Sequence, residues 1–187
     1  RNHRQSWQLL QANWHRAYPW SAHTDSVHDR GGSQVIATDG DEIALATIAR
    51  SNCLGADNAA GVWILREMAK AGKEGLYIFH RGEESGGIGS EYVVKKTPGV
   101  VADIKAAIAF DRKGTTDVIT HQVHRTCSNE FADSFAAIAG MGYKASANGS
   151  FTDTKSYMAL IPECTNISVG YHGAHSSSES QDLNHLQ

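Results

Sequence analysis

Five short segments of the sequence carry side chains that could bind metal ions. They contain His23 and Asp25, Asp57, the pair Glu83 and Glu84, Asp111, and His175 with Glu179. Imidazole nitrogens and carboxylate oxygens together suit zinc or a similar borderline divalent ion. The pattern therefore predicts a metal site, provided that the fold brings these distant segments together.

The number of candidate ligands favours two ions over one. Two histidines and three carboxylates exceed the needs of one tetrahedral site that keeps a position open for water. Two ions about 3.5–4 Å apart, sharing a bridging carboxylate, would use such a set. Each segment alone has an ordinary explanation, since Asp57 could cap a helix and the glutamate pair could be a solvated loop. Their common position, at the ends of predicted strands, favours the metal site.

Apolar strands alternate with amphipathic helices along the chain, which indicates an α/β fold. We expect strands at residues 17–22, 35–37, 43–48, 75–80, 104–110, 118–123 and 166–171. We expect helices at residues 1–16, 57–72, 88–96, 128–141 and 152–160, and a short one from 182. Pro19 would place the first strand at an edge, whereas 75–80 has the composition of a buried strand.

The predicted architecture is a three-layer α/β sandwich with a mostly parallel, mixed central sheet. In such open sheets, ligands bind at the carboxyl ends of the strands, where the candidate ligands fall. Short strands on either side of Asp39-Gly40 should pair as a hairpin. No internal repeat or linker divides the chain, so we expect one catalytic domain over residues 1–187.

Composition excludes several classes of function. The 187 residues carry a net charge of −3, without the basic face that nucleic-acid binding requires. No apolar run reaches the roughly 20 residues needed to cross a bilayer. The three cysteines match neither a disulfide framework nor a zinc knot and favour a reducing compartment, so we expect the cytoplasm. The chain starts at Arg1 and not at Met, so a leader could have been removed. The last expected helix stops at Gln187 soon after it begins, which suggests a fragment of a longer chain.

Four motifs resemble those of the co-catalytic zinc exopeptidases, a superfamily that includes bacterial leucyl aminopeptidase, peptidase T and glutamate carboxypeptidase. They are HTDSV at 23–27, LGADNAAG at 54–61, GEESGGIGS at 82–90, and NISVGY at 166–171 followed by His175, Ser176 and Glu179. They occur in the family's order and span most of the chain. The ligand spacings leave no room for an inserted lid domain, so the resemblance is to a bare catalytic domain.

The resemblance implies a role for each candidate residue. Asp57 would bridge two zinc ions, for which Co²⁺ or Mn²⁺ could substitute, and the Asp57–Asn58 peptide would be cis. One ion would also take Glu84 and His175, and the other would take His23 and Asp111. Glu83 would be the general base, and Asp25 would orient His23. His172 competes with His175 as a ligand, but the closing motif favours His175.

The substrate is less well defined by the sequence. An aminopeptidase is favoured, with Glu83 or Asp153 as the carboxylate that holds a free α-ammonium. A carboxypeptidase or an N-acyl-amino-acid deacylase would instead use Arg112 or Arg125 to hold a carboxylate. Tyr171 or a histidine could stabilise the oxyanion. A non-catalytic homologue that binds metal or protein is the remaining alternative, and the oligomeric state stays open.

Overall fold

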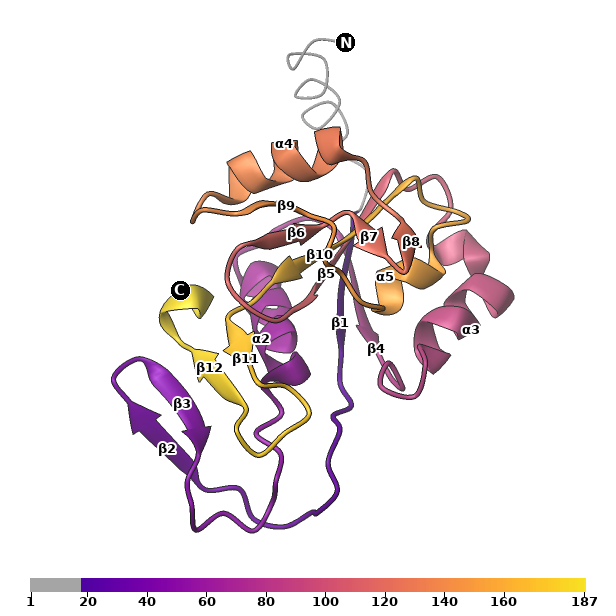
Figure 1. Ribbon diagram of the computed structural model, residues 1–187. Helices are drawn as coiled ribbons and strands as arrows, with labels where there is room; N and C mark the ends of the chain where they lie inside the picture. The colour runs from indigo at the N-terminus through magenta and orange to yellow at the C-terminus, as the bar shows by residue number, and fades with distance from the viewer. Residues whose placement is uncertain (1–17) are drawn as a thin grey trace.

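The computed structural model describes residues 18–187, so the helix expected at 1–16 lies outside the described part. A six-stranded sheet forms the centre of the molecule (Figure 1). Its strands, in spatial order, are β4 (Leu76–His80), β1 (Pro19–His23), β5 (Ala106–Arg112), β10 (Glu163–Ser168), β6 (Asp117–Ile119) and β9 (Lys144–Ser146). Four of the five pairings are parallel, and only β10 with β6 is antiparallel. This is the mostly parallel mixed sheet that the sequence predicts.

Two strands have exchanged the positions expected of them. β1 lies inside the sheet, between β4 and β5, although Pro19 suggested an edge. Pro19 is the first residue of the strand, where a missing N–H costs no ladder hydrogen bond. In the described central sheet β4 is one of the two edge strands, with β9 at the other edge, and its Phe79 is 47% exposed. Composition alone could not show which of these strands lies at an edge, because tertiary contacts decide which strands pair.

Helices cover both faces of the sheet, which confirms the three-layer sandwich (Figure 1). On one face, α2 (Ala56–Lys70) packs on β1 and β5, and α4 (Asn129–Ala139) packs on β6 and β9. Leu65 of α2 and Ala132 of α4 share one core cluster with Ala106 and Ile108 of β5. On the other face, α3 (Ile88–Lys96) and α5 (Asp153–Ser156) lie over Ala107. Successive residues of β5 thus face opposite layers, which explains why the strand is apolar throughout.

A second, smaller sheet lies beyond the carboxyl end of the central one (Figure 1). Its order is β11 (Tyr171–His172), β12 (Ser180–Asp182), β3 (Glu42–Leu45) and β2 (Ile36–Asp39). The predicted hairpin is confirmed, since β2 and β3 pair antiparallel around the turn at Gly40. Short 3₁₀ helices follow α3 at Pro98–Val100 and end the chain at Asn184–Leu186.

The strand expected at 118–123 is interrupted. β6 ends at Ile119, and the chain then forms a small hairpin of β7 (His121–Gln122) and β8 (His124–Arg125). Val123, at the turn of this hairpin, has a φ of 68°, a left-handed conformation that a strand cannot contain. The helix expected at 152–160 is also shorter, because α5 ends at Ser156. Among residues 18–187, no helix is both long and apolar enough to span a membrane.

Truncation of Leu65 should test the packing of α2 on the sheet. Leu65 is fully buried among the strands of the central sheet, so Leu65→Ala should lower the free energy of unfolding by about 2–5 kcal/mol. Ile48 is 75% exposed, and Ile48→Ala should change stability by less than about 0.5 kcal/mol. Urea denaturation of both variants measures the difference. Equal losses would mean that α2 does not pack as described.

Candidate metal centre

The carboxyl edge of the central sheet brings the candidate ligands together. His23 is the last residue of β1, and Asp111 is the penultimate residue of β5. Glu83 and Glu84 lie in the loop between β4 and α3, and His175 lies in the loop between β11 and β12. Parallel strands place their carboxyl ends at one edge, so residues far apart in sequence become neighbours.

Asp57 lies in an irregular turn at the start of α2. Gly55 adopts a left-handed conformation, and Asp57 and Asn58 have non-helical backbone angles. The Asp57–Asn58 peptide bond is cis, as the resemblance implied. The Asn58 side chain accepts a hydrogen bond from the Gly61 N–H at 3.0 Å and so caps the helix. The capping role considered for Asp57 thus belongs to its neighbour, and the Asp57 carboxylate is left to face the site.

Gly61 allows this turn to pack closely on the sheet. A Cβ atom at this position would collide with the carbonyl oxygen of Phe110 in β5 and with the Asn58 side chain. The glycine that closes the 54–61 motif is therefore required by the approach of α2 to the strand that carries Asp111.

The two oxygens of Asp57 face two different histidines. Oδ1 lies 3.1 Å from His23 Nε2, and Oδ2 lies 3.3 Å from His175 Nε2. On the first side, Asp111 Oδ1 is 3.2 Å from the same His23 nitrogen. On the second side, Glu84 Oε1 is 2.9 Å from His175 Nε2. The side chains thus form two groups that share Asp57.

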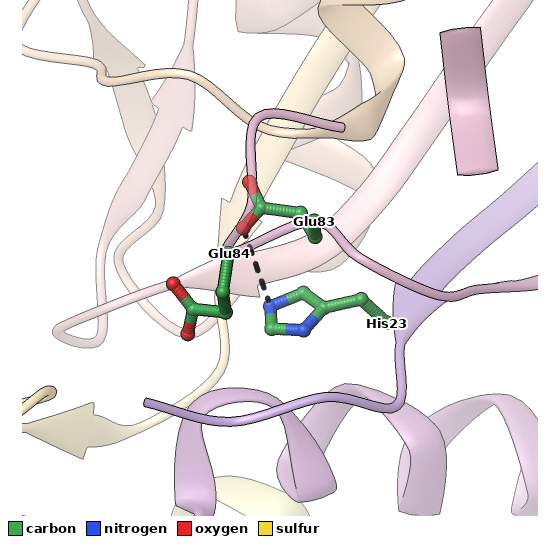
Figure 2. A group of neighbouring side chains, drawn as sticks. All are labelled: His23, Glu83 and Glu84. Carbon is green, nitrogen blue, oxygen red and sulfur yellow. Dashed lines mark ion pairs between the residues drawn. The ribbon is translucent and has the colours of Figure 1, made fainter. Parts of the chain in front are cut away.

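The paired glutamates point into this site from one loop (Figure 2). The carboxylate of Glu83 faces the His23 ring, with Oε2 4.0 Å from Nε2, and Glu84 extends beside the same ring. Glu83 is 8% exposed, whereas the His175 side chain is 49% exposed. The site is therefore buried at Glu83 and His23 and open to solvent at His175.

Asp25 contacts both His23 and the loop that carries the paired glutamates. The Nδ1 atom of His23 lies 3.0 Å from the backbone carbonyl of Asp25 and 3.6 Å from its carboxylate, so the hydrogen bond goes to the main chain. The Asp25 carboxylate accepts hydrogen bonds from the N–H groups of Gly82, Glu83 and Glu84 at 2.9, 3.2 and 3.1 Å. One residue thus orients His23 and holds the glutamate loop.

Three further side chains brace Asp111, and none was among the sequence candidates for this role. The Thr152 hydroxyl donates to Asp111 Oδ2 at 2.6 Å. Asn166 Oδ1 accepts from the Asp111 N–H at 3.0 Å, and the Tyr171 hydroxyl donates to the Asp111 carbonyl at 2.9 Å. Tyr171 was considered as a hydrogen-bond donor to the oxyanion, but its hydroxyl group donates to the Asp111 carbonyl instead. The sequence signal for these contacts was a polar residue at the start of the expected helix 152–160 and polar residues in the expected strand 166–171.

Burial, hydrogen bonds and neighbouring charges shift the pKa of several groups in the site. Burial, together with the charge of Asp111, raises the pKa of Glu83 to about 8. Burial and the Asp57 charge raise the pKa of Glu84. Burial lowers the pKa of His23, but hydrogen bonds to Asp111 and Asp57 outweigh it and raise the pKa to about 12. For Asp25 burial raises the pKa, yet the backbone N–H groups prevail and lower it. These shifts indicate that the site favours a bound cation.

The donor set fits divalent cations. His23 with Asp57 and Asp111, and Asp57 with Glu84 and His175, each offer three ligand atoms within 4.8 Å of one another. A third group of this kind contains His23 with Glu83 and Glu84. Mixed imidazole and carboxylate ligands suit zinc, and a cation would offset the repulsion between these buried carboxylates. We conclude that the residues present can hold the expected metal.

Of the other sequence candidates, the two arginines already have partners, whereas Asp153 is buried near the site. Arg112 donates to Asp117 Oδ2 at 3.2 Å from two nitrogens, and Arg125 donates to Asn129 Oδ1 at 2.9 Å. Asp153 is 1% exposed. Burial raises the pKa of Glu83 most, and the charge of Asp153 is among the further causes that raise it.

Three other histidines, among them His172, also lie outside these groups. His172 is exposed in β11 and belongs to none of the metal-ligand groups found among the described residues. His121 Nδ1 lies 2.9 Å from the hydroxyl of Thr120, and His124 is exposed in β8.

Solved structures with the same fold include several peptidases. Aminopeptidase PepT from Bacillus cereus superposes with a TM-score of 0.71 at 13% identity, covering 91% of this chain and 77% of its own. A tripeptidase from Staphylococcus aureus gives 0.65 at 12% identity with the same coverage. Aminopeptidase LapA from Legionella pneumophila gives 0.62 at 19% identity, covering 91% of this chain and 46% of its own. These likenesses establish the shared fold.

The sequence itself matches a known family over most of its length. No curated protein matches it significantly. Residues 11–159, however, match the sequence model of peptidase family M28, and this region contains four of the five ligand-bearing segments. The match confirms the predicted class of enzyme, a zinc-dependent metallo-exopeptidase. The chain belongs to peptidase family M28.

Proposed function

We propose that this chain is an aminopeptidase that removes the N-terminal residue of a peptide at a dinuclear zinc site. Asp57 would bridge the two ions. His23 and Asp111 would complete one set of ligands, and Glu84 and His175 would complete the other. Glu83 would act as the general base. The buried and free cysteines Cys53, Cys127 and Cys164 agree with a reducing compartment such as the cytoplasm.

The position of Asp57 carries this proposal. A carboxylate that binds a single ion has no need of a histidine beside each of its two oxygens. Here Oδ1 is 3.1 Å from His23 Nε2 and Oδ2 is 3.3 Å from His175 Nε2. Each oxygen also has a carboxylate partner on its own side, Asp111 and Glu84 respectively. This arrangement supports two ions with one shared ligand.

Different residues of the chain would have different roles in peptide hydrolysis. Zinc bound at this site would supply Lewis acidity that polarises the scissile carbonyl and lowers the pKa of water. Glu83 would accept a proton from the attacking water at its carboxylate and return it to the nitrogen of the leaving amine. Asp25 would keep Glu83 aimed through its hydrogen bonds to the loop N–H groups. The exposed side of the site, at His175, would admit the peptide.

Charge at the site favours a substrate with a free amino group. The carboxylate of Glu83 would attract an α-ammonium, whereas a substrate carboxylate needs a cationic partner such as arginine. Both arginines considered for that role are already engaged, Arg112 with Asp117 and Arg125 with Asn129. This supports an aminopeptidase over a carboxypeptidase or an N-acyl-amino-acid deacylase.

A pair of dipeptides should test this assignment. We expect Leu-Gly to be hydrolysed and N-acetyl-Leu-Gly to be cleaved at least about 100-fold more slowly, because the blocked amine lacks the positive charge. Chelation should abolish hydrolysis, and Zn²⁺ should restore it, with metal analysis giving two ions per chain.

Each other outcome of this assay would support a different function for the chain. Preferential cleavage of the blocked peptide would indicate a deacylase or carboxypeptidase. Metal uptake without hydrolysis of either peptide would indicate a non-catalytic homologue, and the absence of metal uptake would remove the proposed site altogether.

A further inference from the structure

Glu179 is a buried carboxylate beside the candidate metal centre without a role in the proposed reaction. It lies four residues beyond His175, immediately before β12, and is 2% exposed. A charged side chain at this depth is rare unless its charge is used. Glu179 therefore needs an account of what it binds.

Both oxygens of Glu179 bind the turn that carries Asp57. Oε2 accepts a hydrogen bond from the Gly55 N–H and Oε1 accepts one from the Asp57 N–H, each at 2.8 Å. These two N–H groups lie at the start of α2, where the backbone has no partners within the helix. Only an ionised carboxylate offers two acceptors and no donor to such a pair.

The turn needs an external partner because its own backbone is irregular. Gly55 is left-handed, and Asp57 and Asn58 have non-helical angles, so the regular hydrogen bonds of a helix do not define it. Asn58 caps the helix on the far side of Asp57. Glu179 and Asn58 thus hold the backbone on the two sides of the bridging carboxylate.

The loop that carries Glu179 also carries a candidate ligand. His175 Nε2 lies 3.3 Å from Asp57 Oδ2, while Glu179 Oε1 binds the Asp57 N–H. Inside the loop, the Ser176 hydroxyl donates to the Gly173 carbonyl at 2.7 Å and its carbonyl accepts from the Glu179 N–H at 3.3 Å. A single loop therefore contacts Asp57 at both its side chain and its main chain.

We propose that Glu179 is a positioning residue that fixes Asp57 relative to His175, so that both can bind the same ion. Burial and the nearby charge of Asp57 both oppose ionisation of Glu179 and raise its pKa. A divalent ion offsets the repulsion between these two carboxylates. The expected effect of Glu179 is therefore larger on metal affinity than on the stability of the apoprotein. This inference rests on the proposed metal centre.

Glu179→Gln is the direct test. The amide keeps the size of the side chain but presents an NH₂ group to one of the two N–H donors, which breaks one hydrogen bond. We expect Zn²⁺ affinity, measured by competition with a chelator, to fall about 10–100-fold, as for other groups that orient ligands. The melting temperature of the chelated protein should change little, and the rise on adding Zn²⁺ should become smaller.

Glu163→Gln is a matched control at a similar clamp. Glu163 Oε2 accepts from the Ser128 N–H at 2.7 Å and Oε1 from its hydroxyl at 2.8 Å, at the start of α4. It begins β10, so it lies at the other end of the strand from the metal centre. The same chemical change there should leave Zn²⁺ affinity within about twofold of wild type.

The outcomes separate failure of this inference from failure of the proposed function. If the wild-type protein binds no Zn²⁺, the metal centre itself is wrong. If wild type binds Zn²⁺ and Glu179→Gln binds it equally well, or loses no more affinity than Glu163→Gln, only the role of Glu179 is wrong. Should Glu179→Gln not fold, Glu179→Asp keeps the charge and both acceptors. A wild-type Zn²⁺ affinity in that shortened variant would equally contradict a positioning role.

Discussion

Glu83→Gln should lower kcat for Leu-Gly by about 10³-fold while leaving two metal ions bound. A glutamine keeps the shape of the side chain but cannot take a proton from water, and general-base catalysis contributes roughly 10²–10⁴-fold. Glu83 belongs to neither ligand group that shares Asp57, so its charge is not needed to retain the ions. Steady-state kinetics together with metal analysis of the same preparation would measure both effects.

The control for this variant is Glu91→Gln. Glu91 lies on the outer surface of α3 and pairs with Lys95 at 2.7 Å, away from the site. An exposed pair of this kind contributes little to stability, so kinetics and metal content should match wild type. Hydrolysis by Glu83→Gln at the original rate would show that another group is the base. Loss of an ion would show instead that Glu83 is a ligand, as its group with His23 and Glu84 also allows.

Asp57→Ala should reduce the metal content from two ions per chain to nearly none. The carboxylate is the one side chain common to the two ligand groups, so each group would keep only a histidine and one carboxylate. Two protein ligands are fewer than the three of a typical catalytic zinc site. Hydrolysis should fall at least about 10³-fold, since the Lewis acid is lost with the ions.

His175→Ala provides the contrast for Asp57→Ala. His175 belongs to only one of the two groups that contain Asp57, so this variant should keep the ion held by His23, Asp57 and Asp111. Metal analysis by mass spectrometry should therefore give about one ion for His175→Ala and about none for Asp57→Ala. Equal stoichiometry in the two variants would contradict a bridging role for Asp57.

The ligand types could be predicted because metal binding demands particular atoms. His23, Asp57, Glu84, Asp111 and His175 are the residue types that bind zinc, and each follows an apolar segment or precedes a helix. The alternation of strands and helices then predicts a sheet whose carboxyl edge collects such residues. The structure brings the same five side chains together, within the two groups that share Asp57.

The supporting contacts could not be predicted in the same way. Thr152 begins the helix expected at 152–160, yet its hydroxyl donates to Asp111 and makes no capping hydrogen bond to that helix. Glu179 binds backbone N–H groups that lie more than 120 positions earlier in the chain. A backbone N–H leaves no mark on the sequence, because every residue except proline has one, and only the folded chain shows which are left without a partner.

The order of the strands was the other feature beyond the reach of sequence patterns. Apolar composition identified β4 and β1 as strands, because a buried strand needs apolar side chains wherever it lies. Their exchange of edge and interior positions depends on which strands pair, and every strand offers the same backbone groups for pairing. The candidate ligands could thus be predicted from the sequence, whereas the contacts that position them depend on tertiary packing, since those contacts join segments that lie far apart in the chain.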